Sequence, residues 1–380
     1  MGEKVAILGI GMTEIDNGES HKKLEEMVFE ASYKALQNAS LSRDEIESVV
    51  IAGNDELDGR SISSMLLSAP AGAYLKDEIK VTDEGIYAIL LASMRLLSGV
   101  FDLSLAVSWC KTSEAPVSNV MKMKWDPFFH REFGLNDVTA TGLMANVYKS
   151  KYSLAEEIPA KVVVKNRKNG AKNPRAHLRS PITLDQVMAS PFVSWPLKKL
   201  EFAPLSDGAC ALVLASERKV KELRRDPVWI KGFGWATDSY YPGEKNLSEL
   251  SSLEIAARKA YEMAGIRNPL TDIDVAEIYD LSAYHELLAY EALGICKKGR
   301  AANLLNEGVT EISGKFPVNR SGGLLSSNPY FASGMVRVAE AFLQVKGAAG
   351  PIQIPGTKNA LAHGSCGFMG QGNAVIILGY

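Results

Sequence analysis

The sequence predicts an α/β protein made of two similar halves. Short runs of apolar and β-branched residues alternate with longer segments of helical periodicity, which is typical of strands and helices packed in layers. The order of these elements in the first part of the chain recurs in the last part. Such a recurrence indicates an internal duplication, and the shared order of elements is stronger evidence for it than any single motif.

The first half opens with a buried strand that ends in glycines and continues with a helix rich in Ala, Glu and Leu. After a second strand, residues 81–91 (VTDEGIYAILL) combine a strand end, a turn that closes on Gly85 and the start of a buried helix. The elements expected in this half are strands at 5–11, 49–53, 102–109 and 206–216, and helices at 24–38 and from about Gly85.

The second half repeats this plan. The run VWIKGFGWAT corresponds to the first strand, and GGLLSSNPYFASG precedes a helix as VTDEG does in the first half. We expect the two central helices, which begin near Gly85 and Ser333, to lie between sheets and to pack near each other. The elements expected in this half are strands at 228–237, 275–280 and 373–380, and helices at 250–265 and 335–346.

Between the two halves, the composition changes from about Lys111 to Leu200. Met, aromatic and basic residues cluster in MKMKWDPFFHREF, and KNRKNGAKNPRAH is rich in Lys, Arg and Asn with little periodicity. This pattern predicts an inserted, loop-rich segment. The expected units are an N-terminal half (1–110 with 200–222), a loop or cap domain (111–199) and a C-terminal half (223–380).

Composition excludes several classes of function. A net charge of −2 over 380 residues gives no electrostatic basis for binding nucleic acid, and no apolar run approaches the roughly 20 residues that span a bilayer. The N-terminus enters an apolar strand directly, so we expect no signal peptide. The four cysteines are widely spaced and form no cluster with histidine, so we expect no metal site, no disulfide framework and a cytoplasmic location.

Several segments together resemble the thiolase superfamily over nearly the whole chain, and in particular its sterol-carrier-protein-type branch. They are AKVVVKNRKNGAKNPRAH, PLSDGACALVLAS, AEIYDLSAYHELLAYEALGICKKG, NRSGGLLSSNPYFASG and NALAHGSCGFMGQGNAV. The resemblance implies a five-layer αβαβα fold with an inserted loop domain, at least a homodimer, and acyl-CoA thioesters as substrates. Coenzyme A would then be part of the substrate, with no covalently bound cofactor.

The catalytic positions depart from the thiolase pattern. In thiolases the turn before the first central helix reads Cys-x-Ser/Thr-Gly, and counting back from Gly85 places Thr82 at the nucleophilic cysteine. A threonine hydroxyl has no accessible thiolate. The Asn that thiolases use in the oxyanion hole corresponds to His285, and the His of their Gly-His-Pro motif corresponds to Asn328, which is followed by the aromatic Tyr330.

This pattern of departures resembles the thiolase-like aldolases of steroid side-chain degradation. Those enzymes cleave a β-hydroxyacyl-CoA by retro-aldol chemistry without the cysteine, rely on tyrosines, and work with a small zinc-ribbon/OB-fold acyl-CoA-binding protein. The reaction needs a base for the β-hydroxyl proton and stabilisation of the enolate. The resemblance implies Tyr330, Tyr284 and His285 as catalytic candidates, with Asn328 and backbone N–H groups of residues 364–367 as oxyanion donors.

Other candidate residues keep two interpretations. Cys366 aligns without gaps with the second thiolase cysteine, the acid/base, but anchoring the alignment on His363 places a glycine there. His363 itself is a candidate oxyanion or supporting residue. Lys168, Lys172 and Arg175 are candidates for the phosphates of coenzyme A or belong to a solvated face. Thr82 can also be a helix cap, and Tyr279 can face the same cavity or belong to the core.

Three functions therefore stay open. The first is the retro-aldol lyase. The second is another reaction on the same fold, namely acyl transfer of the acetyl-CoA acyltransferase type, with Cys366 or another group, or acyl-CoA hydrolysis. The third is a non-catalytic acyl-CoA-binding subunit of a thiolase-like complex. Fold alone does not distinguish among them.

Overall fold

The computed structural model describes residues 3–19, 21–82 and 84–380. Nine strands form one mixed sheet in the order β3-β2-β4-β7-β1-β8-β11-β10-β9. The strands of the first half are β1 (Val5–Met12), β2 (Ser48–Gly53), β3 (Asp77–Thr82), β4 (Leu103–Cys110) and β7 (Gly208–Ser216). Those of the second half are β8 (Val228–Thr237), β9 (Val275–Glu277), β10 (Asn359–Cys366) and β11 (Gly372–Gly379).

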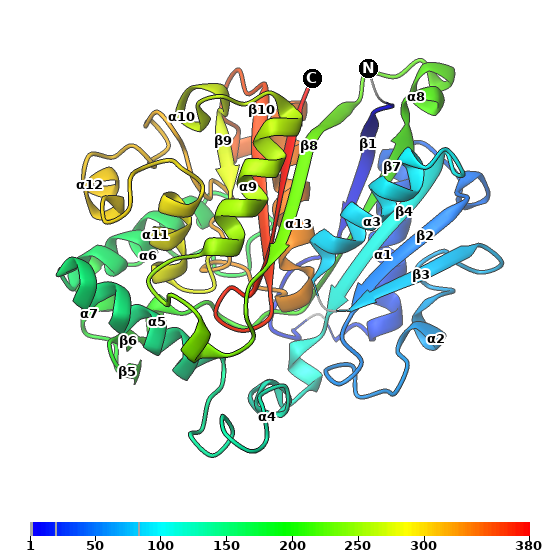
Figure 1. Ribbon diagram of the computed structural model, residues 1–380. Coiled ribbons are helices and arrows are strands. Elements are labelled where there is room, and N and C mark those ends of the chain that lie inside the picture. Colours follow the sequence, from blue (N-terminus) through cyan, green and yellow to red (C-terminus); the bar gives the residue numbers. More distant parts are fainter. Residues whose placement is uncertain (1–2, 20, 83) are drawn as a thin grey trace.

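The two halves of the sheet join at β1 and β8, which pair antiparallel over three residues, Val5 to Ile7. Beyond this short junction the two half-sheets diverge and enclose two central helices, α3 (Gly85–Leu97) and α13 (Ser333–Lys346), as Figure 1 shows. Helices α1 (Leu24–Asn38) and α9 (Ser251–Ala264) cover the outer faces. This is the five-layer αβαβα fold predicted from the sequence.

The layers arise because the side chains of each strand point alternately to the two faces of the sheet. In β7, Cys210, Leu212 and Leu214 pack in the core that contains α3 and α13. The residues between them pack against α1 on the other face. Because successive side chains of a strand point to opposite faces, an unbroken apolar run predicts a strand covered on both sides.

The central helices begin where the sequence predicts, at Gly85 and Ser333, and they pack together. Both contribute to one apolar core. The backbone N–H of Gly334 in α13 donates to Glu84 Oε1, at the N-cap of α3, over 2.8 Å. The expectation that these helices lie side by side between the half-sheets is confirmed.

The duplication extends to the contacts of the outer helices. A Cβ on Gly11 in β1 would lie 2.1 Å from the carbonyl oxygen of Ala31 in α1. A Cβ on Gly234 in β8 would lie 2.3 Å from the carbonyl oxygen of Ala256 in α9. Each outer helix therefore rests directly on a strand at a position where only glycine fits.

The segment between the halves is more helical than the sequence suggested. It contains α4 (Val117–Met123), α5 (Asp137–Tyr152), α6 (Glu157–Gly170), α7 (Leu184–Met188) and a hairpin of β5 (Phe192–Ser194) and β6 (Leu197–Lys198). Figure 1 shows α5, α6 and α7 beside α11 (Ala283–Ala292). The expectation of a loop-rich segment is corrected, and the boundaries 1–110 with 200–222, 111–199 and 223–380 stay a prediction.

The remaining helices are short and peripheral. They are α2 (Ser64–Leu67), α8 (Glu217–Leu223), α10 (Pro269–Asp272) and α12 (Ala301–Asn306). No helix in the described part of the chain is both long and apolar enough to cross a membrane.

The close contact at Gly234 gives a stability prediction. Gly234→Ala should lower the free energy of unfolding by about 1–3 kcal/mol, because the added methyl group forces α9 away from β8. Gly243→Ala is the matched control, since a Cβ there meets no heavy atom within 4 Å. Chemical denaturation of both variants measures the effect, and equal stabilities would contradict this packing.

Candidate active site

A cavity of about 200 Å³ lies where the inserted segment meets the second half of the chain. Its wall comes from α4 and α5, from the residues after β9, from the residues before α13 and from the loop between β10 and β11. Tyr330, His285 and Cys366, three of the candidates predicted from the sequence, all line it. Their convergence from distant parts of the chain makes this cavity the candidate active site.

Tyr330 lies in a single 3₁₀ turn that leads into α13 and is 8% exposed. Its φ of +36° is a left-handed conformation, which is costly for a residue other than glycine and which clusters at functional sites. Its hydroxyl donates a hydrogen bond to Asp137 Oδ2. Burial, followed by the charge of Asp137, raises the pKa of Tyr330 well above its usual value, so the phenol stays protonated at neutral pH.

Asp137 was not predicted from the sequence. It is the first residue of α5 in the inserted segment, behind an Asn136 cap whose side chain accepts from Val138 and Thr139. The helix N-terminus stabilises the negative charge of its carboxylate. No local motif marks the residue, because its partner Tyr330 lies 193 positions away in the sequence.

Tyr279 is a second phenol in the cavity wall. It follows β9, and its backbone N–H donates to His363 Nδ1 over 3.3 Å. Burial and then the negative charges of Glu84 and Asp137 raise its pKa well above the usual value. The interpretation of Tyr279 as a residue facing the cavity is the one that agrees with the structure.

His285 reaches the cavity from the first turn of α11. Its Nδ1 lies 2.9 Å from Ser282 Oγ, which also accepts the His285 backbone N–H over 3.4 Å. Where the serine hydroxyl donates its proton to Nδ1, the ring proton of the neutral imidazole lies on Nε2. Burial, with smaller contributions from His363 and Lys245, lowers the pKa of His285 to about 4. The ring is a neutral N–H donor.

Tyr284 occupies a different environment. Its side chain is 3% exposed and belongs to the core formed by α9, α11 and the inserted helices. It is absent from the residues that line the cavity. Successive residues of a helix point about 100° apart, so Tyr284 and His285 face different surroundings.

Cys366 lines the cavity from the end of β10. A Cβ on Gly372 would lie 2.6 Å from Cys366 Sγ and 2.9 Å from the hydroxyl oxygen of Tyr87, a residue of α3. The thiol and the phenol therefore lie on the same side of Gly372. Burial raises the pKa of Tyr87, which keeps this phenol neutral.

Thr82 and Asn328 lie outside the cavity wall. Thr82 is the exposed last residue of β3, and the N-cap of α3 is Glu84, so the interpretation of Thr82 as a helix cap is wrong. Asn328 is fully buried, and its Oδ1 accepts from Ser333 Oγ over 2.9 Å. Its Nδ2 has no hydrogen-bond partner within the described part of the chain.

The three basic candidates differ in their surroundings. Lys168 is exposed, with Nζ 4.0 Å from Glu311, and Lys172 is exposed as well. Arg175 instead binds the buried carboxylate of Glu340 through two nitrogens, over 2.9 and 2.6 Å. The ion pair between Arg175 and Glu340 thus holds the inserted segment against α13. A role for Arg175 in binding phosphate would require this ion pair to break.

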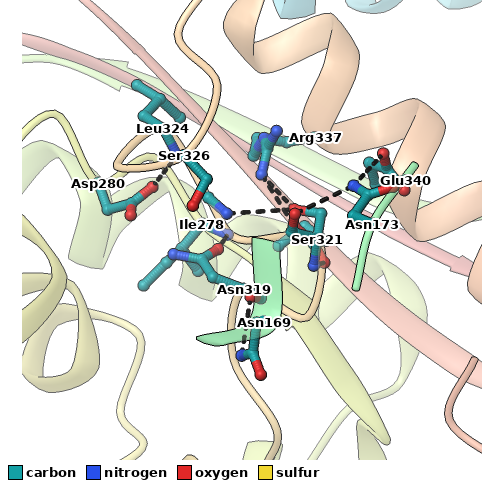
Figure 2. Close-up of polar contacts among 12 residues, drawn as sticks. Asn169, Asn173, Ile278, Asp280, Asn319, Ser321, Leu324, Ser326, Arg337 and Glu340 are labelled. Carbon is teal, nitrogen blue, oxygen red and sulfur yellow. Dashed lines mark hydrogen bonds and ion pairs between the residues drawn. The ribbon is translucent and has the colours of Figure 1, made fainter. Parts of the chain in front are cut away.

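A buried polar network supports the chain segment that leads to Tyr330. Figure 2 shows Asp280 accepting from the backbone of Leu324 over 2.6 Å and Arg337 donating to Ser321 Oγ over 2.6 Å. From the inserted segment, Asn173 donates to the Ser321 carbonyl over 3.0 Å. The chain segment that leads to Tyr330 is thereby attached both to α13 and to the residues that follow α6.

No group of three or more His, Cys, Asp or Glu side chains within the described ranges is placed to hold a metal ion.

Comparisons with known proteins agree with this architecture. The family described as "Thiolase C-terminal domain-like" matches residues 236–380. Sterol carrier protein 2 from Homo sapiens is 31% identical over 99% of this chain and 72% of its own length. An acetyl-CoA acetyltransferase from Methanothermobacter thermautotrophicus is 28% identical over 94% of this chain and 95% of its own length. The chain belongs to the thiolase superfamily and is of the sterol-carrier-protein type.

Solved structures show the same fold. A structure described as "Ltp2-ChsH2(DUF35) aldolase" has a TM-score of 0.85 at 25% identity and covers 100% of this chain and 98% of its own. The acetyl-CoA acetyltransferase of Bacillus anthracis has a TM-score of 0.77 at 17% identity over 100% of this chain and 99% of its own. The second likeness concerns the fold alone.

The environment of His285 gives a prediction about pH. Its pKa of about 4 lies below the usual value of 6.5. In the unfolded chain His285 therefore binds a proton below about pH 6.5, whereas in the native protein it does so only near pH 4. Protonation of His285 therefore favours unfolding as the pH falls through this range. Imidazole NMR signals should show His285 neutral at pH 6, and a pKa of 6 or higher would contradict the buried geometry.

Proposed function

We propose that this protein cleaves the carbon–carbon bond of a β-hydroxyacyl-CoA by a retro-aldol reaction. The observation that carries the proposal is the hydrogen bond from the Tyr330 hydroxyl to Asp137 in the wall of the cavity. A phenol paired with a carboxylate can accept a proton from a substrate hydroxyl while it passes its own proton to the carboxylate. The resemblance to thiolases places Thr82, which is exposed, at the cysteine position, and this reaction needs no cysteine.

The proposed steps use the residues around the cavity. Tyr330 takes the β-hydroxyl proton and transfers its own proton to Asp137. The Cα–Cβ bond breaks, a carbonyl compound leaves, and the electron pair stays on the thioester as an enolate. The neutral Nε2–H of His285 and backbone N–H groups of residues 364–367 stabilise the enolate oxygen. Protonation at Cα, with Tyr279 as the proposed donor, gives the shortened acyl-CoA.

Asn328 lies outside the cavity wall, so its role as a donor to the thioester oxygen stays a prediction from the sequence. Its amide oxygen is occupied by Ser333, and its Nδ2 lacks a partner within the described ranges. An unpaired buried donor is costly, which favours a ligand that satisfies it. Coenzyme A enters only as part of the substrate, and Lys168 and Lys172 are the proposed contacts for its phosphates.

The comparisons support an assembly as well as a reaction. The structural relative described as an aldolase has a second component, ChsH2(DUF35), in its description. We propose that this chain forms a homodimer and works with a small acyl-CoA-binding protein of the zinc-ribbon/OB-fold type. The proposed location is the reducing cytoplasm, in agreement with the four described cysteines forming no disulfide.

Acyl transfer of the acetyl-CoA acyltransferase type is the second candidate function. Cys366 lines the cavity, and one relative is an acetyl-CoA acetyltransferase. This reaction would place an acyl group on a side chain and would require free coenzyme A to complete turnover. The two candidate functions can therefore be distinguished. Retro-aldol cleavage releases a carbonyl compound, whereas acyl transfer requires free coenzyme A as a co-substrate.

Removal of one hydroxyl tests the role of Tyr330. Tyr330→Phe keeps the packing of the ring, so thermal stability should change little while kcat falls by about 100- to 10,000-fold. Tyr284→Phe removes a phenol hydroxyl outside the cavity and should cleave at nearly the wild-type rate. Steady-state kinetics with mass-spectrometric detection of the products gives both values. Near-wild-type cleavage by Tyr330→Phe would refute the assignment of Tyr330 as the group that takes the β-hydroxyl proton.

Thr82 should be dispensable for the reaction. Thr82→Ala removes the hydroxyl at the thiolase nucleophile position, and we expect most of the cleavage activity to remain because Thr82 lies outside the cavity wall. Peptide mass mapping after incubation with substrate should find Thr82 unmodified. An acyl group trapped on Thr82 would overturn the proposed chemistry.

A further inference from the structure

His363 lies behind the cavity wall and connects two parts of it. The side chain is 1% exposed and belongs to β10. Its Nδ1 accepts the backbone N–H of Tyr279 over 3.3 Å, and its Nε2 lies 2.8 Å from Asn373 Oδ1 in β11. Asn373 Nδ2 lies 2.8 Å from the Gly370 carbonyl and 2.7 Å from Ser252 Oγ, at the start of α9. Both Tyr279 and Gly370 line the cavity.

The Gly370 carbonyl determines which atom is the donor and which the acceptor in each of these hydrogen bonds. The Gly370 oxygen can only accept a hydrogen bond, so the amide of Asn373 must turn its NH₂ group toward it. The Asn373 oxygen then faces His363 Nε2, which must carry the ring proton in order to donate. Nδ1 is left with a lone pair, and it accepts the N–H of Tyr279. Ser252 Oγ also donates to the Gly370 carbonyl, over 3.1 Å, and this agrees with the same order.

We propose that His363 is a positioning residue. Asn373 holds it as the Nε2–H tautomer, and His363 in turn fixes Tyr279 relative to the loop of residues 367–371, which lines the same cavity. The Tyr279 ring meets the His363 ring edge-on, with centroids 6.3 Å apart, so the imidazole supports both the backbone and the ring of this phenol. Rotation of the imidazole would break its hydrogen bonds with both the Tyr279 backbone and Asn373. The kinetic part of the test rests on the proposed function, whereas the tautomer does not.

The tautomer is measured in the wild-type protein without substrate. Histidine labelled with ¹⁵N distinguishes a protonated from an unprotonated ring nitrogen, and His363→Asn identifies the signals of His363 by their loss. We expect a neutral ring with the proton on Nε2 at neutral pH. A proton on Nδ1, or on both nitrogens, would overturn the proposal whatever reaction the protein catalyses.

Two variants of His363 test positioning through kinetics. His363→Asn places an amide oxygen near the position of Nδ1, where it can still accept the Tyr279 N–H. His363→Leu fills a similar volume but offers no acceptor. For the β-hydroxyacyl-CoA that the wild-type protein cleaves, His363→Leu should lower kcat by about 10- to 100-fold with a much smaller change in KM, because Tyr279 is displaced. His363→Asn should recover most of that loss.

The outcomes separate this inference from the proposed function. Equal kcat values for the two variants, at either the wild-type or the reduced level, would refute positioning through Nδ1. If the wild-type protein cleaves no β-hydroxyacyl-CoA, the proposed function fails, and the ¹⁵N measurement still decides the tautomer. Should His363→Leu fail to fold, the wild-type tautomer is again the deciding result.

Discussion

The backbone at the N-terminus of α13 contacts the Glu84 carboxylate at the N-cap of α3, and the position of the candidate site depends on this contact. A Cβ on Gly334 would lie 2.7 Å from Glu84 Oε1 and 3.1 Å from the Cα of Gly364 in β10. Any larger residue there would separate the central helices from the strand that ends at Cys366. Because α13 is held so closely, the turn that precedes it is held too, and Tyr330 can keep a left-handed backbone that an isolated peptide would avoid.

Three of the side chains that line the cavity, Tyr330, Tyr279 and His285, are neutral donors. Burial raises the pKa of Tyr330 and Tyr279 and lowers the pKa of His285, so the two phenols and the imidazole are all uncharged N–H or O–H donors near pH 7. Desolvation disfavours the charged form of each group, whichever sign that charge has. Such a site suits a reaction that moves a proton and stabilises an enolate oxygen, and it is less suited to forming a covalent acyl-enzyme.

Sequence reasoning located the central helices and three cavity residues because each lies beside a distinctive local pattern. Tyr330 follows Asn-Pro, His285 lies in the first turn of a helix rich in apolar residues, and Cys366 lies in a glycine-rich run. Asp137 was missed because its proximity to Tyr330 arises only from the folding of the inserted segment. The sequence does not reveal helix α6, because buried polar residues, including Lys165 bound to Glu286 over 2.6 Å, conceal its apolar face. The tyrosine beside His285 proved to be a core residue, since adjacent helical positions face different ways.

Cleavage in D₂O without added coenzyme A tests the cysteine-independent reaction most directly. The protein is incubated with a series of β-hydroxyacyl-CoA thioesters, and the products are identified by mass spectrometry. Retro-aldol cleavage predicts a carbonyl compound and a shortened acyl-CoA that carries one deuterium at its α-carbon, because the enolate takes one proton from solvent-exchanged groups. A strict requirement for free coenzyme A, with an acyl group recovered on Cys366, would contradict retro-aldol chemistry and assign the site to acyl transfer.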